Sequence, residues 1–221
     1  MSMKNGFLSF AGICGILGPI VWIITAALAV SNSPSFSISS NWFSDLAGTM
    51  GADNPLWARS VADTPTTAMI FNSGIILVGI IGIIFGVGLW KSILTPSGRI
   101  GAFAFIISAI GTIGVGVYPE PAGLPHSLAG IMSFGFAAIG MFYIGASAME
   151  TNQKTLGYII TILGLITLTA LSTYMVILEF HFQTYFRATS QLIALSAAWI
   201  FSIIFGVKIF KGPNPILSKS T

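Results

Sequence analysis

The sequence predicts an all-α membrane protein, a polytopic bundle of six transmembrane helices that forms a single domain over residues 1–221. Only 7% of the 221 residues are charged and 54% are hydrophobic, whereas soluble domains average about 25% charged residues. The mean hydropathy is +0.90. Six apolar runs have the roughly 17–25 residues that a helix needs to cross the hydrocarbon core, and none alternates in polarity like a membrane β-strand. The runs cover residues 7–30, 67–90, 99–117, 127–149, 156–178 and 189–210.

The basic residues predict the orientation of this bundle. Cytoplasmic segments of membrane proteins carry an excess of Lys and Arg. With both termini in the cytoplasm, seven basic residues lie inside and only Arg59 and Arg187 lie outside. The inner set is Lys4, Lys91, Arg99, Lys154, Lys208, Lys211 and Lys219. We therefore expect a multi-pass protein of the cell membrane with cytoplasmic N- and C-termini.

The first run contains Pro19, which follows Gly15 and Gly18. A proline inside a helix removes one backbone hydrogen bond and favours a bend. The run of 7–30 is longer than the roughly 7–15 apolar residues of a signal peptide. We expect a bent, retained first helix.

The long outer loop, residues 31–66, exceeds the roughly 2–8 residues that usually connect bundle helices. Within it, Trp42, Leu46 and Met50 recur at four-residue spacing after a possible serine cap at Ser39 or Ser40. This pattern predicts a short amphipathic helix at the interface or in the mouth of the bundle.

Small residues mark two helix faces for close packing, because they let helix backbones approach one another in lipid. The first face belongs to the second run and the other to the third run. The predicted packing positions are Gly82, Gly86, Ala104, Ser108, Thr112 and Gly116.

Polar residues gather in the loops on the predicted outer side. The turn from Tyr118 to His126 contains three prolines, and the segment from Glu179 to Arg187 alternates polar and aromatic residues. Ionisable groups close to hydrocarbon are retained for pairing or for function. The predicted outer polar cluster is Asn41, Ser44, Asp45, Glu120, His126, Glu179, His181 and Arg187.

This cluster has two interpretations. In the first, its charges pair and hold the loops together, since buried charges are costly unless paired. In the second, Asp45, Glu120 and His126 are catalytic candidates that act as acid and base or bind a metal that activates water. The sequence has no His-Glu-x-x-His or Gly-x-Ser-x-Gly motif, and Cys14 is the only cysteine. We expect no metal and no cofactor.

Three short motifs resemble a known family. They are Asn-x-x-Ser-Asp-Leu at 41–46, Ile-Phe-Asn at 70–72 and the turn at 118–126. Together they resemble the archaeal members of domain-of-unknown-function family 998, which are six-helix membrane proteins. The resemblance implies a six-helix fold and an outward polar cluster that includes Asp45, Glu120, His126 and Arg187.

The sequence also departs from the family pattern. Relatives often have an acid after a Phe-Pro-Glu turn and a Glu-Arg pair before the last helix. Here Pro121 follows Glu120, and Phe186 precedes Arg187.

The leading functional hypothesis is a structural, accessory or binding component of a membrane assembly. The alternatives are an enzyme that acts on lipid headgroups at the outer leaflet and a transporter of small solutes. The expected partners are membrane lipids and other membrane protein subunits, and nucleic acid is not expected.

Overall fold

The computed structural model describes residues 3–38, 41–48, 65–179, 187–212 and 217. Six long helices make up almost all of this part of the chain, and each is long and apolar enough to cross a membrane. They are α1 (Met3–Ser31), α2 (Pro65–Ser92), α3 (Pro96–Val117), α4 (Leu124–Glu150), α5 (Lys154–Glu179) and α6 (Arg187–Lys211). Two short 3-10 helices, η1 (Phe43–Ala47) and η2 (Glu120–Ala122), lie between them. The predicted all-α class and six spans are confirmed, and the chain is a multi-pass membrane protein.

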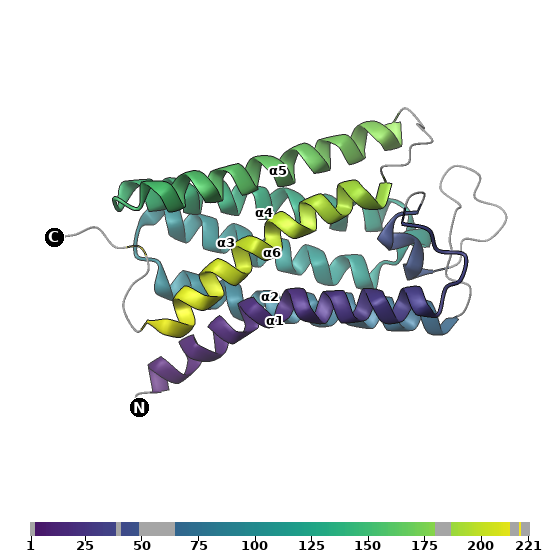
Figure 1. Cartoon of the computed structure of the whole chain (residues 1–221), viewed down its shortest axis with the longest axis horizontal. Helices are drawn as coiled ribbons and strands as arrows, with labels where there is room; N and C mark the ends of the chain where they lie inside the picture. The colour runs from purple at the N-terminus through teal and green to yellow at the C-terminus, as the bar shows by residue number, and fades with distance from the viewer. Residues whose placement is uncertain (1–2, 39–40, 49–64, 180–186, 213–216, 218–221) are drawn as a thin grey trace.

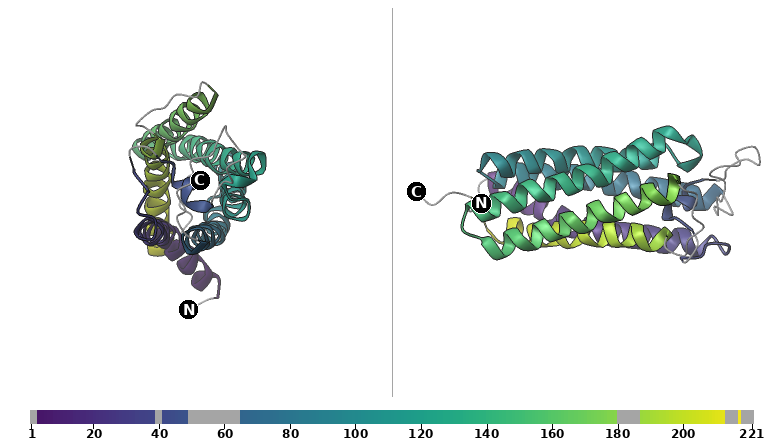
Figure 2. Two further views of the ribbon diagram at one scale, coloured as in Figure 1. Left: turned by 90° about the vertical axis from the view of Figure 1, so that its right-hand side faces the viewer. Right: turned by 90° about the horizontal axis from the view of Figure 1, so that it is seen from above.

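The six helices form a closed ring. Each helix packs against its neighbours in chain order, and α1 packs against α6. Viewed from the end in Figure 2, η1 lies inside this ring. The start of α1 and the end of α6 lie at the opposite end of the bundle, as Figure 1 shows. We call these two ends the η1 end and the terminal end.

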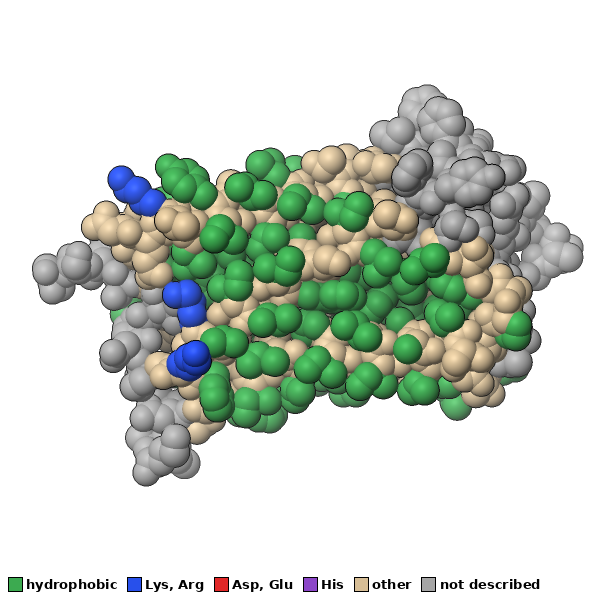
Figure 3. All heavy atoms as spheres, in the orientation of Figure 1, with side chains coloured by type: hydrophobic (Ala, Val, Ile, Leu, Met, Phe, Trp, Pro, Cys, Tyr) green, Lys and Arg blue, Asp and Glu red, His purple; other side chains and the backbone are tan. Residues whose placement is uncertain are grey.

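The outer surface of the ring suits contact with lipid. Large hydrophobic side chains such as Ile24, Phe103 and Leu165 are more than half exposed. Figure 3 shows hydrophobic side chains along the middle of the bundle and Lys and Arg side chains at the terminal end. An apolar band of this kind is expected where helices face hydrocarbon, because lipid is as apolar as the side chains.

Glycines allow α1 and α6 to close the ring near the terminal end. A Cβ atom on Gly12 would lie 2.7 Å from the backbone oxygen of Gly206, and one on Gly206 would lie 2.8 Å from the backbone oxygen of Gly12. Neither position has room for a side chain. The bend of α1 in Figure 1 accompanies Pro19, which lies inside the helix. A proline at this position removes the hydrogen bond to the carbonyl four residues earlier.

The predicted packing positions lie between α2, α3 and α4. A Cβ atom on Gly86 would meet Ile106 at 2.7 Å, and one on Gly116 would meet the backbone oxygen of Asn72 at 2.7 Å. Gly82 faces Ala109 of α3. Of the remaining positions, Ala104 and Ser108 are buried and Thr112 is half-buried.

A packed core fills the bundle toward the terminal end. Phe105 lies 5.5 Å from Phe85 and 5.1 Å from Phe201, measured between ring centroids, and Phe201 lies 4.9 Å from Phe205. We call these four residues the phenylalanine floor. Closer to the terminal end, Leu217 is fully buried, and its carbonyl accepts a hydrogen bond of 3.0 Å from the backbone of Leu94.

The connection between α1 and α2 places η1 in the mouth of the ring. All five residues of η1 are buried, so this turn has no face directed to solvent. Trp42 precedes it in an extended conformation. Three residues of the predicted short helix lie outside the described part of the chain, namely the possible caps Ser39 and Ser40 and the helix residue Met50.

Candidate functional site

Two hydrogen bonds fasten η1 to the ring. The side-chain amide of Asn72 in α2 donates to the Ala47 carbonyl at 2.6 Å. The Oε1 atom of Gln191 in α6 accepts a hydrogen bond from the Phe43 backbone at 2.7 Å. These bonds join opposite ends of η1 to two different helices. We call residues 41–48 the lid.

Aromatic contacts seat the lid against α1 and α6. The Trp22 ring meets Phe43 edge-on at 5.0 Å between centroids, and Phe43 also lies 5.5 Å from Phe36. Trp22 contacts Trp199 of α6 at 5.0 Å. Leu46 of the lid is fully buried. The lid is therefore packed into the ring.

Asp45 stabilises the lid itself. Its Oδ2 atom accepts hydrogen bonds from the Trp42 backbone and from the Asn41 side chain, each at 3.0 Å. Asn41 Oδ1 in turn accepts from the Ser37 backbone at 2.9 Å. A carboxylate that accepts from backbone donors at the start of a turn satisfies groups that would otherwise be buried without partners.

The turn before α4 lies beside the lid. A Cβ atom on Gly48 would lie 3.1 Å from Pro121. His126 is buried in the first turn of α4, and its Nδ1 atom lies 2.7 Å from the Tyr118 carbonyl. Since a carbonyl oxygen only accepts, Nδ1 donates this bond. His126 thus joins the start of α4 to the end of α3.

The predicted outer polar cluster is distributed over these features. Asn41, Ser44 and Asp45 belong to the lid, and all three are buried. Glu120 is half-buried in η2. Three further members, namely Glu179, His181 and Arg187, have side chains outside the described part of the chain. Within the part that is described, no three His, Cys, Asp or Glu side chains lie close enough together to hold a metal ion.

A cavity occupies the interior of the ring beneath the lid. Its volume is about 180 Å³, and residues of η1 and of all six helices line it. On α1, α2, α3, α4 and α6 the contributing residues recur at helical spacing and form one stripe each, whereas α5 contributes Ala170 and Leu171. The α4 stripe is His126, Gly130, Ser133, Phe134 and Ala137. The α3 stripe is Phe105, Ser108, Ala109, Thr112 and Val115.

The cavity extends from the lid into the middle of the bundle. Phe43 and Ser44 of the lid line its roof, and Phe85 and Phe105 of the phenylalanine floor line its base. The α4 stripe runs from His126 to Ala137, a distance of about 16 Å at 1.5 Å per residue. This depth is about half of the roughly 30 Å hydrocarbon core.

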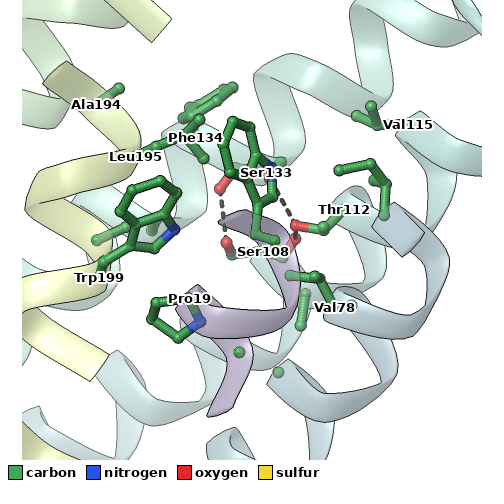
Figure 4. A pocket seen from close by; sticks show the side chains of 18 of the residues that line it. Pro19, Val78, Ser108, Thr112, Val115, Ser133, Phe134, Ala194, Leu195 and Trp199 are labelled. Carbon is green, nitrogen blue, oxygen red and sulfur yellow. Dashed lines mark hydrogen bonds between the residues drawn. The ribbon is translucent and has the colours of Figure 1, made fainter. Parts of the chain in front are cut away.

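Three hydroxyl groups project together on the α3 and α4 walls, as Figure 4 shows. Ser108 Oγ donates to the Ser133 carbonyl at 2.6 Å. Thr112 Oγ1 donates to the Ser108 carbonyl at 3.1 Å and lies 2.8 Å from Ser133 Oγ. We call Ser108, Thr112 and Ser133 the hydroxyl triad.

A family model described as "Protein of unknown function (DUF998)" matches residues 16–208 of the chain. The chain belongs to this family. The matched region begins in α1 and ends in α6, so it contains the lid, the hydroxyl triad and most of the cavity wall. No curated protein and no solved structure shows a significant match.

The sequence does not predict the cavity of this DUF998 protein. The spacing of Ser108 and Thr112 predicts helix packing, and no motif in the sequence points to Ser133, Gln191 or Gly130. The sequence does carry a partial signal for the contacts of the lid. Asn72 belongs to the motif Ile-Phe-Asn that carries the family resemblance, and in the structure it fastens the lid.

Proposed function

We propose that this DUF998 protein binds a small, mainly apolar molecule of the membrane inside its helix ring. The cavity under the lid is the observation that supports this proposal. Its volume of about 180 Å³ exceeds that of an engineered apolar cavity of about 150 Å³ that binds benzene. Sites for small molecules are concave and mostly apolar, with a few polar groups. This proposal corresponds to the binding component among the functions considered from the sequence.

The chemistry of the cavity wall favours an uncharged ligand. No Lys, Arg, Asp or Glu occurs among the described residues that line the cavity. An ion in such a place would lose its hydration without gaining a partner of opposite charge, which costs several kcal/mol or more. The phenylalanine floor also separates the cavity from the terminal end. These features support binding of an apolar molecule more than transport of a charged solute.

Two of the three catalytic candidates, Asp45 and His126, make hydrogen bonds that support structural roles. Asp45 accepts hydrogen bonds within the lid, and His126 Nδ1 bonds to the end of α3. Hydrolysis needs a base within reach of the proton that it removes. Each of these two side chains bonds a backbone group at the end of a turn or helix, and this arrangement supports a structural role for both.

We further propose that the protein lies in the cell membrane with its terminal end in the cytoplasm. The described basic residues Lys91, Arg99, Lys154, Lys208 and Lys211 belong to the loops and helix ends on that side. Positive residues favour the cytoplasmic side of a membrane. The lid and the cavity then belong to the outer leaflet, and the ligand comes from the lipids around the protein.

The proposal is tested with the two tryptophans of the cavity wall, Trp22 and Trp199. The protein is placed in lipid nanodiscs that contain increasing small amounts of 1-bromodecane, whose bromine quenches tryptophan fluorescence at short range. We expect quenching that saturates at a low mole fraction of the bromoalkane. Substitution of both tryptophans by phenylalanine removes this saturating component.

A cavity-filling variant provides the decisive comparison. Gly130 lies in the middle of the α4 stripe, and a Cβ atom on it would meet no other atom within 4 Å. Gly130→Leu therefore fills the cavity and is expected to abolish saturating quenching. Gly6→Leu is the matched control, because Gly6 is an exposed helix position that also has open space around it. Quenching that rises linearly in the native protein, or is unchanged in Gly130→Leu, would overturn the proposal.

A further inference from the structure

We infer that the ligand carries a neutral hydrogen-bond donor, an alcohol O–H group, which binds the hydroxyl triad on the α3 and α4 walls of the cavity. This inference rests on the proposed function and specifies the chemical class of its ligand. It is drawn from the hydrogen-bond geometry of Ser108, Thr112 and Ser133.

Only one allocation of protons makes all the bonds of the triad at once. A hydroxyl group has one proton to donate and two lone pairs that accept. The Thr112 proton is used on the Ser108 carbonyl. The 2.8 Å contact between Thr112 and Ser133 therefore uses the Ser133 proton. The Ser108 proton is used on the Ser133 carbonyl.

This allocation leaves the triad with acceptor capacity and no proton to offer. The Oγ atoms of Ser108 and Ser133 act as donors in these bonds, so their lone pairs remain available. Both residues line the cavity. A ligand that only accepts hydrogen bonds, such as an ether, ester or ketone, would place its oxygen lone pairs against those of Ser108 and Ser133. An alcohol supplies the missing proton.

The position of the triad determines how the ligand lies. Ser108 is nine residues from the end of α3 at Val117, and Ser133 is nine residues from the start of α4 at Leu124. At 1.5 Å per residue, both lie about 13 Å below the η1 end. Phe105, one turn away from Ser108, forms part of the floor. The alcohol group thus binds deep in the bundle, and the hydrocarbon extends back toward the lid.

This orientation is opposite to that of a lipid in the bilayer, whose polar group stays at the surface. A hydroxyl group in hydrocarbon lacks partners and is costly there. The triad removes this cost only for a ligand that can donate. The site would consequently select medium-length alcohols from a membrane that is full of longer, acceptor-rich lipids.

The test compares two isomeric probes in the nanodisc assay, 10-bromodecan-1-ol and 1-bromo-9-methoxynonane. The ether has the same number of heavy atoms as the alcohol and keeps an oxygen, but it has no hydroxyl proton to donate. We expect the alcohol to half-saturate the quenching at about a tenfold lower mole fraction, which is the effect of one neutral hydrogen bond. In the double variant Ser108→Ala/Ser133→Ala the alcohol should bind as weakly as the ether. Ser172→Ala, an exposed serine of α5 away from the cavity, is the control.

The outcomes separate this inference from the proposed function. Equal binding of alcohol and ether would overturn the inference, while saturating quenching by the bromoalkane would leave the proposed function standing. An advantage of the alcohol that survives in the double variant would also overturn it, because recognition would then lie elsewhere. Absence of saturation with every probe would overturn both.

Discussion

The two hydrogen bonds that fasten the lid can be broken separately. Asn72→Ala removes the only described donor to the Ala47 carbonyl, and Ala47 is 1% exposed. A buried group without its partner costs about 1–3 kcal/mol. The same substitution also removes Asn72 Oδ1, a buried acceptor with no donor among the described residues. The two effects oppose each other, so we expect a net loss of about 1 kcal/mol.

Gln191→Leu has no such compensation. It leaves the Phe43 backbone N–H, which points to Gln191 Oε1 at 2.7 Å, without an acceptor, and the expected loss is about 2 kcal/mol. Gln191→Glu keeps an acceptor at this position and should cost less. For a chain of this length, 1 kcal/mol lowers the unfolding midpoint by about 2–4 °C. We therefore expect a decrease of about 2–4 °C for Asn72→Ala and about 4–8 °C for Gln191→Leu.

The double variant distinguishes a fastened lid from two unrelated contacts. Both bonds hold the same five-residue turn. Once the first substitution has released this turn, the second should lower the free energy of unfolding by less than it does alone. The assay is thermal unfolding of the detergent-solubilised protein, followed by circular dichroism. Unchanged midpoints in both single variants, or decreases that simply add in the double variant, would refute this account of the lid.

Three further predictions concern the ring, the floor and the cavity wall. Gly12→Val places a side chain 2.7 Å from backbone atoms of α6. We expect the free energy of unfolding to fall by about 3 kcal/mol and the unfolding midpoint to fall with it, whereas Gly6→Val should change little. Equal effects of the two substitutions would contradict the ring closure. Phe201→Ala removes a fully buried ring of the floor and should cost about 3–5 kcal/mol, measured in the same way, and a loss below 1 kcal/mol would be inconsistent with a packed floor. Cys14 is buried and lines the cavity. We therefore expect the small reagent methyl methanethiosulfonate to add one thiomethyl group, detected by mass spectrometry, and a bulky charged maleimide not to react. The opposite preference would place this thiol outside the cavity.

The helices were predictable because their cause is local. A run of about 20 apolar residues in a chain with few charges has no stable alternative to a helix in lipid, since every backbone group must be hydrogen-bonded within the segment. The six spans inferred from composition match the observed helices closely. Pro19 acts within one turn of its own position, and the bend of α1 could be expected from it for the same reason.

The cavity was not predictable because its cause is the closure of the ring. Ser108 and Thr112 recur at four-residue spacing, and this spacing is the same whether a stripe faces a neighbouring helix or an empty interior. The stripe becomes a cavity wall only when α6 returns to pack against α1. No local pattern specifies that contact between the first and last helices.

The role of Asp45 depended on tertiary structure for a similar reason. The sequence placed this carboxylate in the loop at the correct end of the bundle but could not show which way it points. In the structure its Oδ2 atom accepts hydrogen bonds from Trp42 and Asn41. These bonds hold together the lid over the cavity, and the sequence alone does not specify them.

Native mass spectrometry of the protein purified from membranes tests the central claim most directly. If the ring binds a small apolar molecule, the native protein and Gly6→Leu should each carry an additional mass that survives delipidation in mild detergent. Gly130→Leu, in which the cavity is filled, should show the mass of the polypeptide alone while it remains folded. The same additional mass on Gly130→Leu, or no additional mass on the native protein, would contradict the claim.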